Sequence, residues 1–102
     1  MNSKKEYYAV IFTSKRTSLE AGYKEASVKM ELLAKKQPGF LGMDSARNEI
    51  GITVSYWDSL EAIKNWKQNA EHQIVQKKGK EKWYSQFNVR ICKVEREYSF
   101  LK

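Results

Sequence analysis

The sequence contains little cysteine, proline or histidine, and each scarcity excludes a class of protein. Of the 102 residues, one is Cys, one is Pro and one is His. The single thiol, Cys92, cannot form an internal disulfide, so nothing indicates an oxidising compartment. One His and one Cys do not supply the ligands of a dedicated zinc site. We therefore predict no metal centre.

Long apolar segments and nucleotide-binding motifs are also missing. No segment approaches the roughly 18 consecutive apolar residues that a membrane-spanning helix requires. The apolar stretch from Ala9 to Phe12 is too short for the core of a secretory signal. The sequence has no glycine-rich phosphate loop, dinucleotide fingerprint or G-x-S-x-G elbow, which argues against a nucleotide cofactor and against serine hydrolysis. We expect a cytoplasmic protein with no membrane partner.

Positive charge is plentiful, with a formal net charge of +7. A basic surface can attract nucleic acid. However, the only dense basic run, Lys77–Lys82, is typical of a solvated helix end and loop. No zinc-finger spacing, helix-turn-helix pattern or RNA-recognition motif accompanies it. We therefore do not predict nucleic acid as a partner.

Aromatic residues are frequent for a chain of this length. Three Trp, six Tyr and four Phe predict an aromatic-lined core, cavity or interface. The length itself fits one domain, residues 1–102 with a core over about 7–98.

Hydrophobic periodicity alternates between the β and α types along the chain. Strand patterns cover Tyr7–Thr13, Phe40–Asn48, Ile50–Trp57 and Phe87–Tyr98; helical patterns cover Leu19–Lys36, a segment opening at Asp58, and a further piece over about Ala70–Lys78. Pro38 and Gly39 end the first helix, and Asp58 with Glu61 forms a capping-box pattern for the second. The order β-α-β-β-α-(α)-β predicts an α+β, ferredoxin-like fold, in which helices cover one face of a four-stranded antiparallel sheet.

The other face of the sheet requires a cover of its own. Apolar residues occur on both faces of the first and third predicted strands, so a partner is expected to cover the face that lacks helices. A symmetric homodimer is the simplest arrangement. In the last strand the alternation Phe87, Val89, Ile91 changes phase at Cys92 and Val94, which predicts either a bulge or a strand that leaves one packing surface for another.

Several short motifs together resemble one known family. Pro38-Gly39-Phe40 followed by Gly42 looks like the P-G-F-x-G turn of the antibiotic biosynthesis monooxygenase family. The segment 54–63 looks like its strand-to-helix junction, and Trp66, Glu71-His72 and Trp83-Tyr84 match its W…EH…WY pattern. The resemblance extends from about Tyr7 to Tyr98. It implies a dimeric α+β barrel, and hence a homodimer.

The resemblance implies a reaction class but leaves alternatives open. The family includes cofactor-independent oxygenases of polycyclic aromatic phenols, haem-degrading oxygenases, and domains with no established reaction. It favours a small monooxygenase that oxidises an aromatic or phenolic molecule without a nucleotide cofactor. The alternatives are a haem-degrading oxygenase and a non-catalytic dimeric module that binds a small ligand. Fold analogy does not choose among them.

The haem-degrading branch of the family uses an Asn on the first strand, a Trp on the second helix and a His further along. Trp66 matches that Trp, but the first strand has Phe12 or Thr13 where the Asn is expected. His72 follows Trp66 more closely than the ligand of that branch does. The match to this branch is therefore incomplete.

Two residues are candidates for chemistry. His72 is the only side chain whose ordinary pKa lies near neutrality, so it is either a base or iron ligand, or a surface or helix-capping residue. Trp66 is either the wall of a substrate cavity or a core residue. Cys92 is expected to be a buried strand residue rather than a nucleophile. The further residues predicted to line a pocket are Phe12, Phe40, Trp57, Trp83, Tyr84 and Arg90.

Overall fold

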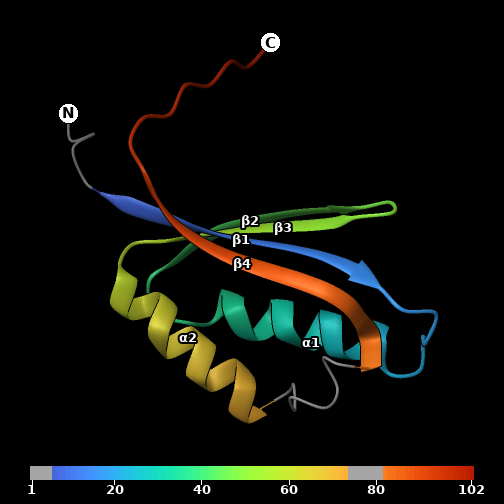
Figure 1. Cartoon of the computed structure of the whole chain (residues 1–102). Coiled ribbons are helices and arrows are strands. Elements are labelled where there is room, and N and C mark those ends of the chain that lie inside the picture. Colours follow the sequence, from blue (N-terminus) through green and yellow to red (C-terminus); the bar gives the residue numbers. More distant parts are fainter. Residues whose placement is uncertain (1–5, 74–81) are drawn as a thin grey trace.

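A computed structural model describes residues 6–73 and 82–102 (Figure 1). Its elements are β1 (Tyr7–Arg16), α1 (Tyr23–Lys35), β2 (Phe40–Arg47), β3 (Gly51–Trp57), α2 (Leu60–Gln73) and β4 (Tyr84–Val94). The predicted helix Ala70–Lys78 is, as far as Gln73, a continuation of α2, and its remainder lies outside the described residues. Most of the basic run Lys77–Lys82 lies outside them as well.

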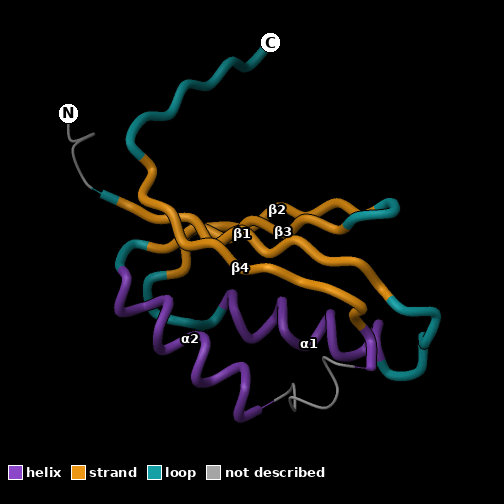
Figure 2. Tube along the Cα trace, in the orientation of Figure 1, coloured by secondary structure: helices purple, strands orange, loops and turns teal. Residues whose placement is uncertain are grey.

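The four strands form one antiparallel sheet in the order β2-β3-β1-β4. Both helices lie against the same face of this sheet, and no described segment covers the opposite face (Figure 2). The predicted α+β, ferredoxin-like fold with a four-stranded antiparallel sheet is therefore confirmed. Among the described residues, no helix has the length and apolar character to cross a membrane.

The hydrophobic core lies where β1 and β3 pack against the helices. Ala34 of α1, Trp57 of β3, and Ala62 and Ile63 of α2 form a buried cluster. Val10 in the centre of β1 packs against it from the sheet. The alternation in β1 thus directs even-numbered residues to the helices and odd-numbered residues to the uncovered face.

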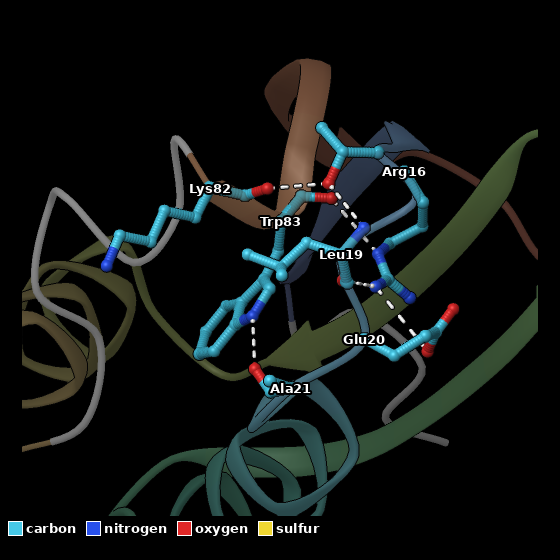
Figure 3. Close-up of polar contacts among 7 residues, drawn as sticks. Arg16, Leu19, Glu20, Ala21, Lys82 and Trp83 are labelled. Atoms are coloured by element: carbon cyan, nitrogen blue, oxygen red, sulfur yellow. Dashed lines mark hydrogen bonds and ion pairs between the residues drawn. The ribbon is translucent and has the colours of Figure 1, made fainter.

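The first helix begins at Tyr23, four residues later than the periodicity predicts. The residues before it form a loop held against the start of β4 (Figure 3). Arg16 Nη2 donates to the Leu19 carbonyl at 2.7 Å, and Trp83 Nε1 donates to the Ala21 carbonyl at 2.9 Å. Because side chains bind these carbonyls, one from the end of β1 and one from residue 83, the loop has its own partners and the helix starts only after Gly22, at φ 79°.

The second helix is capped one residue later than predicted. Ser59 Oγ accepts a hydrogen bond from the Ala62 backbone N–H at 3.0 Å, which makes Ser59 the cap in place of Asp58. The Asp58 backbone N–H instead donates to the Gly39 carbonyl at 2.8 Å. Asp58 therefore ties the start of α2 to the turn that follows α1.

The last strand contains no bulge at Cys92, so the first of the two alternatives predicted for it is wrong. Its pairing with β1 is regular from Tyr7↔Val94 to Lys15↔Gln86, and the register shifts only between Lys15 and Arg16. The change of phase instead reflects two apolar faces: residues such as Ile91 face the helices, and Cys92 faces the other way, opposite Ala9. Cys92 is exposed, not buried.

Candidate functional site

A cavity of about 560 Å³ lies between the sheet and the two helices. The helix-facing side of the strands forms one wall of the cavity, called its floor here, and α1 and α2 form the wall across from it. A volume of this size is typical of a small-molecule site. The apolar lining residues on these elements include Val10, Phe12, Met30, Met43, Ile63, Trp66, Ala70, Val89 and Ile91.

One wall of the cavity is an indole supported by a second indole. The Trp66 ring stacks on Trp57, with ring centroids 6.0 Å apart and planes 22° apart. Trp57 is completely buried, donates from Nε1 to Ser55 Oγ at 2.9 Å, and meets the edge of Phe40. Because Trp57 is fixed on several sides, it holds Trp66 in a defined orientation at the cavity surface.

The opposite end of the cavity is built from rings of β1, α1 and β4. Phe12 packs edge-to-face on Tyr84, with centroids 5.5 Å apart. Tyr23 meets both Trp83 and Tyr84 edge-on, at 5.9 and 6.0 Å. Such perpendicular contacts place ring edges against ring faces, the arrangement that aromatic quadrupoles favour.

The phenol of Tyr84 stays protonated. Burial is the largest cause that raises its pKa far above the ordinary value, and a side-chain hydrogen bond with Tyr23 raises it further. The charges of Arg47 and Arg16 act in the opposite direction but do not prevail. At neutral pH Tyr84 is therefore a hydrogen-bond partner and not a base.

Arg16 has a structural role beside this cluster (Figure 3). Its guanidinium lies 3.4 Å from the centroid of the Tyr23 ring, and its Nε donates to the Trp83 carbonyl at 3.0 Å. It also pairs with Glu20, with Nη2 and Oε1 3.7 Å apart. These contacts join the end of β1 to the start of β4 and fix the aromatic end of the cavity.

The predicted site residues separate into three groups. Four of them line the cavity together: Phe12, Trp66, Trp83 and Tyr84. Phe40 and Trp57 belong to the core cluster behind Trp66 and are not part of the lining.

The third group lies away from the cavity or outside the described side chains. Arg90 is paired with Ile11 on the uncovered face of the sheet, and it is not part of the lining. The backbone of His72 belongs to the last turn of α2, two residues after the lining residue Ala70, but its side chain lies outside the described residues.

Sequence reasoning missed two cationic lining residues, Arg47 and Lys67. Charged side chains are mostly solvated, so neither residue stands out in the sequence as one that faces a cavity. Within the described ranges, no group of three or more His, Cys, Asp or Glu side chains is placed to hold a metal ion.

Comparisons with known proteins agree with this architecture. A family model described as antibiotic biosynthesis monooxygenase matches residues 16–78. The uncharacterized protein YqjZ of Bacillus subtilis is 48% identical over 96 residues, which cover 92% of this chain and 84% of YqjZ.

Solved structures share the fold at low sequence identity. A variant of SnoaB, a cofactor-independent oxygenase from Streptomyces nogalater, matches with a TM-score of 0.63 and 11% identity over 91% of this chain and 96% of SnoaB. A variant of MhuD, with two manganese protoporphyrin IX molecules bound per active site, matches with a TM-score of 0.64 and 17% identity over 91% of this chain and 99% of MhuD.

Proposed function

Because this chain belongs to the antibiotic biosynthesis monooxygenase family, we propose that it is a small oxygenase that oxidises an electron-rich aromatic molecule without a nucleotide cofactor. The observation that supports this proposal is the cavity of about 560 Å³ lined by Trp66, Phe12 and Tyr84. Its rings offer faces and edges to a flat ligand and exclude water from it. The fold is shared with SnoaB, which is described as a cofactor-independent oxygenase.

The substrate in this proposal supplies the electrons itself. A polycyclic phenol loses a proton, and the resulting anion reduces dioxygen. One oxygen atom enters the ring as a carbonyl, and the other leaves as water together with two hydrogens of the substrate. The protein contributes a dry cavity and a group that accepts the first proton.

We assign the roles in this reaction to two residues. Trp66 is the wall on which the substrate stacks, because Trp57 holds its ring in place. His72 is the proton acceptor, since its ordinary pKa lies near neutrality and its backbone lies two residues beyond the lining residue Ala70. Tyr84, whose burial raises its pKa, remains protonated and orients the substrate by hydrogen bonding.

The test is oxygen uptake by the purified protein with a panel of polycyclic phenols, in the presence of a metal chelator and without nicotinamide or flavin. We expect a substrate-dependent rate that falls roughly 100-fold in His72→Ala, the lower end of what a positioned proton acceptor contributes. Lys64→Ala, an exposed substitution on the same helix, is the control and should keep the rate. Saturable binding of the phenols without oxygen uptake would instead indicate a non-catalytic module.

A haem-degrading function is the second candidate, because a variant of MhuD with the same fold binds manganese protoporphyrin IX. The described lining contains no imidazole and no thiolate, and the protonated Tyr84 is a poor iron ligand. This candidate therefore depends on His72. A haem titration decides it: a saturable Soret band that is lost in His72→Ala and decays under reductant would replace the first proposal.

We also propose that the protein is a homodimer joined through the uncovered face of the sheet. Among the described segments none packs on this face, where Ile11 of β1 lies opposite Val54 of β3. Ile52 on the same face is 44% exposed. A second copy would cover these side chains, and its identical surface makes the contact self-complementary.

Val54→Lys should weaken such a dimer at least about tenfold, because it buries an unpaired charge in an apolar contact. Sedimentation velocity over a range of protein concentrations measures the change. Val28→Lys is the matched control: Val28 is 50% exposed but lies on α1, so the association should not change. A wild-type protein that sediments as a monomer at micromolar concentration would contradict the proposal.

A further inference from the structure

The lining residue Arg47 has no role in the proposed reaction, although its side chain is held in a defined position. It is the last residue of β2 and lies opposite Gly51, the first residue of β3. Its guanidinium lies so close over Gly51 that a Cβ atom there would collide with three of its atoms. The side chain continues across β3 to β1, where Nη2 donates to Ser14 Oγ at 2.5 Å. Gly51 thus provides the space through which Arg47 reaches the floor of the cavity.

The contact with Ser14 fixes the position of the charge. Ser14 is 3% exposed, and its hydroxyl accepts from the guanidinium of Arg47, an exposed residue that also lines the cavity. A guanidinium has five N–H donors, and the contact with Ser14 uses one Nη atom. Further donors of Arg47 are therefore available to a group in the cavity.

Arg47 differs in this respect from Arg16, the other guanidinium at this end of the cavity. Arg16 binds two backbone carbonyls, pairs with Glu20 and stacks on Tyr23. In the described part of the chain, Arg47 has no carboxylate within ion-pair distance. Of the two arginines at this end of the cavity, Arg16 thus has a carboxylate partner and Arg47 has none among the described residues.

The surrounding lining favours a negative charge. Among the described lining residues, the charged side chains are Arg47 and Lys67, and none is acidic. Tyr84 lines the same cavity, and the charge of Arg47 lowers the pKa of its phenol, although burial keeps that phenol protonated at neutral pH. A cation without an acidic partner, beside neutral hydrogen-bond donors, is a suitable environment for an anion.

From this geometry we infer that the cavity takes an aromatic carboxylate, whose acid group binds Arg47 while its rings lie against Trp66 and Phe12. The planar fork of a guanidinium matches the two oxygens of a carboxylate, and the match fixes both position and orientation. The inference rests on the proposed aromatic-binding function of the cavity and adds the chemical class of the substrate.

A matched pair of probes tests the inference. Naphthalene-2-carboxylate and naphthalene-2-carboxamide have the same rings and nearly the same shape, but only the first is charged. Isothermal titration calorimetry should give the carboxylate the tighter binding by about 10- to 100-fold, the range for hydrogen bonds to a charged group. The preference should decrease as salt is added, because Arg47 is exposed to solvent.

Three variants assign the preference to Arg47. Arg47→Gln should remove it and leave amide binding within about twofold, since the lost interaction requires the acid group. Gly51→Ala keeps the charge but displaces the guanidinium, so it should weaken carboxylate binding in the same direction. Arg96→Gln removes an exposed arginine from the segment after β4, outside the cavity lining, and should change neither affinity.

The outcomes separate this inference from the proposed function. If both probes bind wild type equally, or if Arg47→Gln leaves the ratio of their affinities unchanged, Arg47 does not bind the acid group, but the proposal of an aromatic-binding cavity is unaffected. If neither probe binds at millimolar concentration, both the aromatic-binding function of the cavity and the carboxylate-binding role of Arg47 are contradicted. Circular dichroism of each variant identifies any loss of fold; Arg47 is exposed, so Arg47→Gln should retain it.

Discussion

Replacing Trp57 by Ala should lower the free energy of unfolding by about 3–5 kcal/mol, the usual cost of truncating a buried tryptophan. Trp57 is the largest side chain that the structure buries completely. Its removal leaves a cavity between β3 and α2 and takes the donor away from the hydroxyl of Ser55, which is 5% exposed. A domain of this size is stable by only about 5–15 kcal/mol, so the variant should lose a large share of its stability.

Urea unfolding followed by circular dichroism measures this loss. Trp83→Ala is the matched control, because Trp83 is only partly buried and its main polar contact is a hydrogen bond to the Ala21 carbonyl. The control should cost clearly less than Trp57→Ala. An equal or smaller loss for Trp57→Ala would show that the core does not depend on Trp57. The substitution should also weaken binding of flat ligands, since Trp66 stacks on Trp57.

Much of the fold follows from local patterns. The alternation in β1 and the helical spacing around Ala34 and Ile63 reflect burial on one face, which repeats at a fixed interval and is visible in the sequence. Local patterns do not predict where the helices and strands begin and end. The start of α1 depends on hydrogen bonds from Arg16 and Trp83, and pairing extends β1 to Arg16 through polar residues that give no strand signal.

Only part of the site was predictable, because burial is visible in the local sequence whereas contacts between different strands are not. Aromatic residues such as Phe12 and Trp66 are conspicuous in the sequence because large apolar rings must be buried somewhere. Arg47 was not predictable, because its position depends on Gly51 and Ser14, which lie on two other strands. Arg90, like Arg47, is an arginine in a predicted strand, yet the register of β4 places Arg90 on the uncovered face of the sheet. Only the pairing of strands distinguishes the two arginines.

The second large effect is expected at the turn after α1, where Gly39→Ala should destabilise the protein by about 2–5 kcal/mol. Gly39 has a φ of 89°, a left-handed conformation that costs other residues about 1–2 kcal/mol. A Cβ atom there would also lie 2.6 Å from Ala62 Cβ and 2.5 Å from Asp58 Oδ1, and such overpacking typically costs about 1–3 kcal/mol. The turn cannot easily move away, because the Gly39 carbonyl accepts the hydrogen bond of Asp58.

Gly42→Ala is the matched control for this prediction, three residues further along in β2. A Cβ atom on Gly42 meets nothing within 4 Å, and its φ is not positive. A methyl group there should therefore be neutral or stabilise by up to about 1 kcal/mol, because alanine restricts the unfolded chain more than glycine does. Both glycines belong to the P-G-F-x-G motif, so urea unfolding of the two variants separates a glycine that the backbone requires from one that it does not. Equal losses for the two variants would mean that the motif is retained for a reason other than the conformation and packing of this turn.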